Sequence, residues 1–159
     1  MSNADIKEIK NSCEKNNLPL IEEYDFKQDR KTPDLQIEMK STTQVRDYQE
    51  ASLAKMFSNG RARSGIIVLP CGAGKTLTGI LATSYIKKPT LVLCNCNVSV
   101  DQWLREFCTW SSLGKMPIRF TAKAMQGNRD FGEEMFNENE AGIVISTYTM
   151  ISFSGRRNS

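Results

Sequence analysis

Short runs of apolar residues alternate with longer amphipathic segments through the central part of the chain. The runs are Ile66–Leu69, Thr90–Cys94 and Gly142–Ser146, with a shorter one at Ile118–Phe120. Short apolar runs rich in β-branched residues are typical of strands that are buried on both faces of a parallel sheet. We therefore predict strands at these four positions.

The segments between the runs have helical character. Tyr48, Leu53 and Met56 predict a helix that ends near Asn59 and Gly60. Further helices are predicted from about 75 to 86 and from 100 to 107, and the region from 127 to 140 is a polar loop. Strands that alternate with helices in this way indicate an α/β domain built on a mostly parallel sheet.

The first 40 residues follow a different pattern. Ile6, Ile9 and Cys13 have near-helical spacing and predict a short amphipathic helix over residues 4–16. Apolar and polar residues alternate from Leu35 to Lys40, which favours a half-buried strand. We expect residues 1–40 to form an N-terminal lead-in and residues 41–159 to form the main domain.

The segment between the first predicted strand and its helix has the chemistry of a phosphate-binding loop. It consists of Pro70, Cys71, Gly72, Ala73, Gly74, Lys75 and Thr76. Glycines allow backbone N–H groups to approach a triphosphate at the mouth of a helix, whose dipole favours the negative charge. The lysine would reach the β- and γ-phosphates, and the threonine hydroxyl would bind Mg²⁺.

The match covers the core of this motif, since Leu69 stands where the consensus has its first glycine. A strand–helix turn with an incidental lysine is the alternative. Because the motif lies between a predicted buried strand and a helix, we predict that the loop binds a nucleotide with Mg²⁺.

Composition narrows the possible functions. The chain has 159 residues, 40% of them hydrophobic, and a formal charge of +3, which permits a nucleic-acid partner without requiring one. It has five cysteines and no histidine, which argues against a zinc site and against Ser-His or Cys-His catalysis. No apolar run approaches the roughly 20 residues of a membrane span, and the first ten residues are polar, so we expect no membrane association. We expect the five cysteines to be reduced thiols.

Several separate stretches, in order, resemble one family. They are residues 19–26, 46–50, 59–65, 69–76, 98–103 and 145–150. Together they closely resemble the eukaryotic XPB helicases, superfamily 2 enzymes that are the ATP-driven DNA translocase subunits of the transcription and nucleotide-excision-repair factor TFIIH. The resemblance implies part of a first RecA-like motor domain, ATP and Mg²⁺ as cofactors, DNA and TFIIH-type subunits as partners, and a nuclear location.

The resemblance also implies roles for two residues ahead of the phosphate loop. Arg46 and Gln49 match the family's adenine-reading motif, and a glutamine amide can both donate to and accept from the edge of adenine. Asp47 stands where the family usually has proline. The alternative is that these side chains belong to a solvated helix face.

Two further segments are similar to the family's DNA-tracking motifs, 94–103 and 146–148. In them Ser99, Gln102 and Thr147 are the candidate contacts to the DNA backbone, without sequence specificity. An ordinary loop after a strand is the alternative. We expect Trp103 and Trp110 to belong to the core, not to stack on bases.

Arg61 and Arg63 have two interpretations. They can face the phosphates of DNA, or they can lie on a solvated surface. The sequence favours neither.

Hydrolysis of ATP at such a site also requires an acidic Asp-Glu box at the end of a strand. The family has this box after the stretch that matches 145–150, whereas the nine residues after Met150 contain no acid. Glu22–Glu23 and Glu133–Glu134 are poor substitutes, and a second motor domain is missing. We therefore expect a truncated ATP-binding portion of the helicase that is not catalytically competent alone, with an uncovered apolar sheet face.

Two alternatives remain open. One is a non-catalytic module that binds a nucleotide or a partner protein. The other is a different phosphate-loop ATPase.

Overall fold

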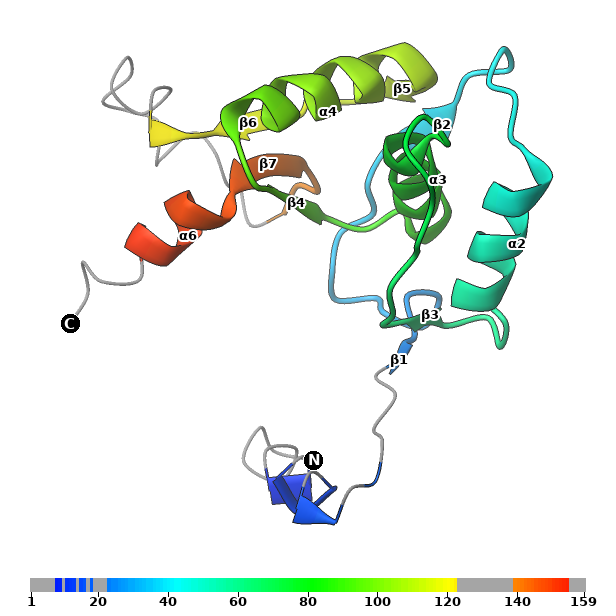
Figure 1. The fold of residues 1–159 in the computed structure, drawn as a ribbon, viewed down its shortest axis with the longest axis vertical. Coiled ribbons are helices and arrows are strands. Elements are labelled where there is room, and N and C mark those ends of the chain that lie inside the picture. Colours follow the sequence, from blue (N-terminus) through cyan, green and yellow to red (C-terminus); the bar gives the residue numbers. More distant parts are fainter. Residues whose placement is uncertain are drawn as a thin grey trace.

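The computed structural model describes residues 8–9, 11–13, 15–16, 18, 23–122 and 139–154. Figure 1 shows the arrangement of the helices and strands. In chain order they are β1 (Glu23–Tyr24), β2 (Ile37–Met39), α2 (Asp47–Met56), β3 (Ala62–Arg63), α3 (Lys75–Ile86), β4 (Thr90–Cys94), α4 (Asn97–Trp110), β5 (Ser111–Leu113), β6 (Ile118–Phe120), β7 (Ile143–Thr147) and α6 (Tyr148–Ser154).

A three-stranded parallel sheet in the order β4-β7-β6 is the centre of the fold. In its register Leu91 lies opposite Val144, and Cys94 lies opposite Thr147. Two antiparallel pairs, β1 with β3 and β2 with β5, lie outside this sheet. The predicted α/β class with a mostly parallel sheet is confirmed.

Helix α4 covers one face of the sheet (Figure 1). Val100 and Phe107 are fully buried there, together with Ile143 and Ile145 of β7. Strand β2 adds Ile37 to the same core. Trp103 and Trp110 pack against this cluster, which confirms their predicted place in the core.

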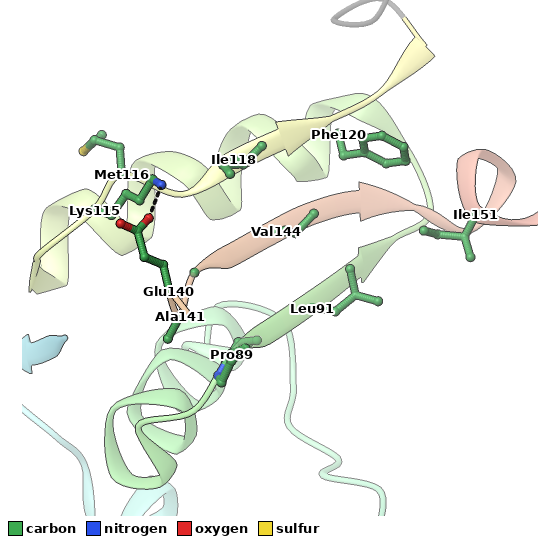
Figure 2. Close-up of a pocket in the computed structure, with 12 residues that line it drawn as sticks. Pro89, Leu91, Lys115, Met116, Ile118, Phe120, Glu140, Ala141, Val144 and Ile151 are labelled. Atoms are coloured by element: carbon green, nitrogen blue, oxygen red, sulfur yellow. Dashed lines mark hydrogen bonds and ion pairs between the residues drawn. The ribbon is translucent and has the colours of Figure 1, made fainter. Parts of the chain in front are cut away.

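The opposite face of the sheet is largely open (Figure 2). Leu91, Ile118, Phe120 and Val144 line a groove of about 380 Å³ there, and Leu91 is 54% exposed. Ile151 of α6 lies at one end of the groove. The expected uncovered apolar face is therefore present.

The strand predicted at Ile66–Leu69 is wrong. The segment lies outside the strands, and Ile66 and Val68 are 91% and 85% exposed. Apolar side chains favour a strand only where a neighbouring strand takes up the backbone hydrogen bonds. None of the described strands pairs with this segment.

The other predicted elements agree closely with the structure. Helix α3 has its predicted bounds, α4 is longer than predicted at both ends, and β7 is shifted by one residue. Within the predicted N-terminal helix, the described residues 8–9, 11–13 and 15 are helical, as predicted. The predicted polar loop lies outside the described residues except for 139 and 140. No helix in the described ranges combines the length and the apolar composition that a membrane crossing needs.

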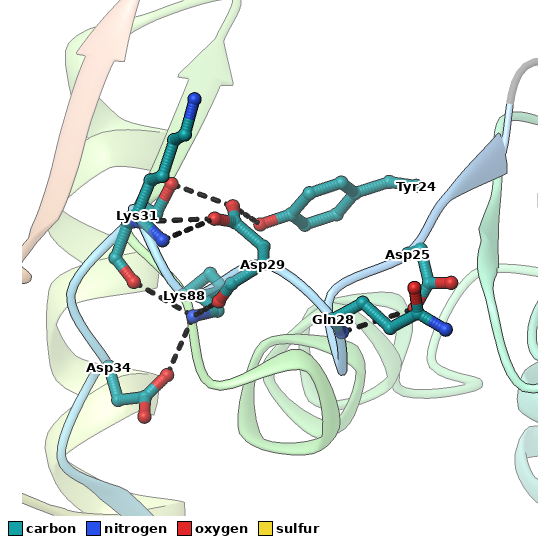
Figure 3. A network of polar contacts seen from close by, with 8 residues as sticks. Tyr24, Asp25, Gln28, Asp29, Lys31, Asp34 and Lys88 are labelled. Atoms are coloured by element: carbon teal, nitrogen blue, oxygen red, sulfur yellow. Dashed lines mark hydrogen bonds and ion pairs between the residues drawn. The ribbon is translucent and has the colours of Figure 1, made fainter.

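A polar network fastens the loop after β1 to the start of β4 (Figure 3). Lys88 is 6% exposed, and its Nζ donates to the carbonyls of Asp29 and Thr32, each at 2.8 Å. It also forms an ion pair with Asp34 at 2.7 Å. Burial and the hydrogen bond to Asp29 raise the pKa of Tyr24 to about 12. The network thus anchors the lead-in beside the sheet.

Candidate nucleotide-binding cleft

The phosphate loop has the backbone conformation that its glycines predict. Gly72 and Gly74 both have φ of +76°, in the left-handed region that other residues adopt only with strain. Gly74 is the N-cap of α3, which begins at Lys75. The free N–H groups of the first turn of α3 therefore follow directly after the loop, as a phosphate site requires.

The first turn of α2 packs against the back of this loop. Gln49 is 2% exposed, and its Nε2 donates to the carbonyls of Ala73 at 3.3 Å and Gly74 at 3.2 Å. The hydroxyl of Tyr48 donates to the same Ala73 carbonyl at 3.0 Å. The loop is thus held by hydrogen bonds from side chains that precede it by 24 and 25 residues.

This contact gives Gly74 a second reason to be glycine. A Cβ at this position would lie 2.6 Å from Nε2 of Gln49. The close approach of Gln49 therefore requires a residue without a side chain, in addition to the positive φ.

The side chains that the motif assigns to phosphate and metal lie at the mouth of the loop. Nζ of Lys75 donates to the carbonyl of Pro70 at 3.0 Å, so the lysine arches over the loop from the first turn of α3. Lys75 is exposed, and Thr76 is half-buried beside it. Both remain accessible to a ligand.

A cleft of about 960 Å³ opens in front of the loop. Its lining includes the predicted nucleotide-binding residues Arg46, Gln49, Cys71, Gly72, Ala73, Gly74, Lys75 and Thr76. Pro70 lines a smaller adjoining hollow of about 420 Å³. Arg46 and Lys75 bring positive charge to the cleft, which suits a phosphate chain.

The predicted DNA contacts divide into two places. Ser99 and Gln102 of α4 line the same cleft as the phosphate loop. Thr147 is not part of that lining; it is 8% exposed, and its Oγ1 accepts from the N–H of Met150 at 3.3 Å. Ser99 and Gln102 follow the carboxyl end of β4, and Thr147 is the last residue of the neighbouring strand β7. This is the edge at which open α/β sheets bind ligands. Their contact with DNA stays a prediction.

Tyr48 and Glu106 are two residues near the loop that sequence reasoning did not assign to the site. Tyr48 contacts the loop from α2, and Glu106 lines the cleft from α4. Glu106 accepts a hydrogen bond from the indole N–H of Trp110. Its spacing of four residues from Gln102 places both on one helix face, a signal that the sequence contained.

Close packing of α3 on α4 forms the wall of the cleft beside the loop. A Cβ on Gly79 of α3 would lie 2.6 Å from the ring of Trp103, which also lines the cleft. The two helices can therefore approach this closely only because residue 79 has no side chain.

A cysteine lies at the start of α4. Hydrogen bonding to Ser99, through its side chain and its backbone, lowers the pKa of the Cys96 thiol. The Ser99 hydroxyl also donates to Oδ1 of Asn95 at 3.2 Å. Ser99 is therefore tied to its own helix terminus.

Arg61 is exposed and Arg63 is half-buried, which fits the interpretation as a solvated surface, and a contact of either arginine with DNA stays a prediction. Arg61 lies 3.3 Å from the carboxylate of Asp25, and Arg63 lies 2.8 Å from that of Glu23. Both therefore pair with acids of the lead-in. Glu23, one of the acids considered as a substitute box, has a lowered pKa because Asn59 and Arg63 donate to it.

In the parts of the chain that the structure describes, no group of three acidic or cysteine side chains forms a metal site. Among the residues lining the cleft, Glu106 carries the sole carboxylate.

The sequence pattern of the family described as "Type III restriction enzyme, res subunit" matches residues 42–157. The chain belongs to this family. The match contains the phosphate loop, α2 and the whole parallel sheet. The parallel sheet and the phosphate-loop match fit a partial RecA-like domain.

Similar proteins include the helicase/translocase subunits XPB of the general transcription and DNA repair factor IIH. The chain is 50% identical to that of Dictyostelium discoideum over 96% of its own length and 18% of the relative's. It is 47% identical to XPB/SSL2 of Saccharomyces cerevisiae over 99% of its own length and 18% of the relative's. It is 45% identical to XPB of Drosophila melanogaster over 96% of its own length and 18% of the relative's. The resemblance to the XPB helicases is confirmed, and the chain spans less than a fifth of these relatives.

Proposed function

We propose that the cleft binds the triphosphate of ATP and that the chain is the ATP-binding portion of a DNA helicase or translocase of the XPB type. The observation that carries the proposal is the loop Pro70–Gly74, whose two left-handed glycines lead into the N-terminus of α3 beside Lys75. On this proposal, residues 41–159 are part of a first RecA-like motor domain, and residues 1–40 are its lead-in.

The residues present fit Mg²⁺ bound with the nucleotide. Thr76 has an accessible hydroxyl next to Lys75, and the cleft admits a ligand of this size. When bound, Mg²⁺ would neutralise part of the charge of the phosphates. Lys75 would hold the β- and γ-phosphates as a point charge, and Arg46 would add positive charge at the rim.

The names of the relatives support a proposal for the cellular process and the partner subunits. Those proteins are described as subunits of a general transcription and DNA repair factor. By analogy we propose that the chain acts in transcription initiation and nucleotide-excision repair, in the nucleus, with TFIIH-type subunits. Ser99, Gln102 and Thr147 are the proposed contacts to the DNA backbone.

A nucleotide titration tests the cleft. The wild-type chain should bind a fluorescent ATP analogue with submillimolar affinity in the presence of Mg²⁺. Lys75→Ala should weaken binding by about 10- to 100-fold, since a hydrogen bond to a charged group contributes about 1.5–3 kcal/mol. Lys115→Ala, on the far groove, is the matched control and should bind as the wild type does. Equal binding by wild type and Lys75→Ala would refute the proposal.

An ATPase assay tests the expectation that this portion is not catalytically competent alone. Glu106, the carboxylate in the cleft, is engaged by Trp110, so we expect ATP turnover no faster than that of Lys75→Ala. This result is also expected for a non-catalytic nucleotide-binding module. DNA-stimulated turnover by this chain would exclude the module and would overturn the expectation that it is not competent alone.

A further inference from the structure

An ion pair joins the edge of the parallel sheet to helix α4. Nη1 of Arg119, on the edge strand β6, lies 3.1 Å from Oδ1 of Asp101 on α4. The neighbours of Arg119 in the chain, Ile118 and Phe120, line the groove on the open face (Figure 2). Because successive side chains of a strand point to opposite faces, Arg119 points to the face that α4 covers.

This ion pair lies among the residues proposed to contact DNA. Asp101 stands between Ser99 and Gln102 in the first two turns of α4. The register of β6 on β7 places Arg119 two residues before the level of Thr147. The pair is therefore adjacent to the proposed path of the DNA backbone, both along α4 and across the sheet.

The chain satisfies the Arg119 guanidinium only in part. Asp101 engages Nη1, whereas the buried Nε has no hydrogen-bond partner among the described residues. A buried donor without an acceptor is destabilising. The side chain of Arg119 is therefore held in its present position mainly by Asp101.

Both members of the pair also reach solvent. The Arg119 side chain is 35% exposed and that of Asp101 is 40% exposed. An ion pair exposed to this extent contributes little to stability, because water and salt screen it. A phosphate, in contrast, offers two acceptor oxygens that match the fork of an arginine. An incoming phosphate can therefore replace Asp101 as the partner of Arg119.

The local charge favours an anionic ligand. Arg105, one turn after Asp101, is an exposed residue on the same side of α4. Two arginines around one aspartate leave this part of the surface positive, and a positive surface attracts the nucleic-acid backbone.

We infer that Arg119 is a further contact to the DNA backbone and that Asp101 is its resting partner, which a DNA phosphate displaces. The inference rests on the proposed function, because it adds a residue to the proposed DNA path. It assigns opposite effects to the two members of one ion pair. Loss of the Arg119 charge weakens DNA binding, whereas loss of the Asp101 charge strengthens it. A purely structural ion pair would give both variants the same defect.

Salt-dependent DNA titrations test the inference. The anisotropy of a fluorescein-labelled oligothymidylate is followed while the full 159-residue chain is added at several salt concentrations. We expect Arg119→Gln to weaken binding about 5- to 50-fold at low salt. It should also reduce the slope of log K against log salt by about 0.7, the value for one phosphate contact on a single strand. Asp101→Asn should tighten binding by up to about 5-fold and leave the slope unchanged.

The ion pair between Lys115 and Glu140 provides the matched control. It is also exposed, and both residues line the groove on the open face of the sheet. Lys115→Gln and Glu140→Gln make the same changes of charge as the two test variants, and both should keep the wild-type slope. Arg119→Lys keeps the charge and loses the fork, so it should bind with an affinity between those of wild type and Arg119→Gln. It also tests the contact if Arg119→Gln fails to fold.

Each outcome has one interpretation. If Arg119→Gln binds as wild type does while Ser99→Ala or Gln102→Ala weakens binding, the inference is wrong and the proposed path stands without Arg119. Weaker binding by both Arg119→Gln and Asp101→Asn also overturns the inference, as does an equal change of slope in Lys115→Gln. If the wild-type chain does not bind the oligothymidylate, the proposed DNA contact fails and the inference fails with it. Opposite shifts at 119 and 101, with a reduced slope at 119 alone, support the inference.

Discussion

Two apolar segments of similar composition have opposite fates in this chain. Thr90–Cys94 forms β4 and pairs along its whole length with β7. Ile66–Leu69 remains outside the sheet, with Ile66 and Val68 almost fully exposed. The difference shows that an apolar run records a preference for burial, whereas a strand exists only where a second strand accepts its hydrogen bonds.

The phosphate loop follows the unpaired segment and is nevertheless well defined. Its conformation is set by the two left-handed glycines, by the start of α3, and by Gln49 and Tyr48 of α2. Most of these constraints are local or come from a single neighbouring helix. The loop therefore forms without the support of a strand at its entrance.

The largest expected effect on stability is the difference between truncating an isoleucine in the paired sheet and truncating one in the unpaired segment. Ile145 of β7 is fully buried, and Ile145→Ala should lower the free energy of unfolding by about 2–5 kcal/mol. Ile66→Ala, at a 91% exposed position, should change it by less than about 0.5 kcal/mol. Urea denaturation of both variants measures the contrast. A similar loss in both would show that Ile66 is buried in solution.

An intermediate loss of stability is expected when the hydrogen bonds between the lead-in and the start of β4 are removed. Lys88→Met removes the donor to the carbonyls of Asp29 and Thr32, which should cost about 1–3 kcal/mol of stability. The neighbouring Lys87→Met is the control, because its ion pair with Glu38 is exposed and should contribute about 0–1 kcal/mol. Chemical denaturation compares them, and equal losses would refute the role of Lys88 as an anchor.

The smallest effect concerns pH. Hydrogen bonds from Tyr24 and Thr32 hold the pKa of Asp29 below its ordinary value near 4. The folded state therefore favours the ionised form, and this contribution is complete above about pH 4 and is lost as the pH falls below it. Asp29→Asn should lower stability at pH 7, with a difference that shrinks toward pH 3. Urea titrations at several pH values test this; a difference independent of pH would contradict it.

Much of the site was predictable because its determinants are local. Gly72, Gly74, Lys75 and Thr76 specify a loop and a helix start within a few residues, and the structure has both. The contact of Gln49 with the loop carbonyls was not predictable. It joins segments that are 24 and 25 residues apart, and no periodic pattern records which way an amide turns.

The sequence by itself determined helices α2, α3 and α4, strands β2, β4, β6 and β7, and the position of the phosphate loop, because hydrophobic periodicity and glycine conformation act over short distances. The short strands β1, β3 and β5 and the helix α6 were not predicted. Tertiary structure decided that Ile66–Leu69 stays unpaired, that Ser99 and Gln102 share a cleft with Lys75, and that Arg63 binds Glu23. Each of these depends on which distant groups are available as partners. A hydrogen bond, an ion pair or a strand pairing requires two partners, and the local sequence pattern describes only one of them.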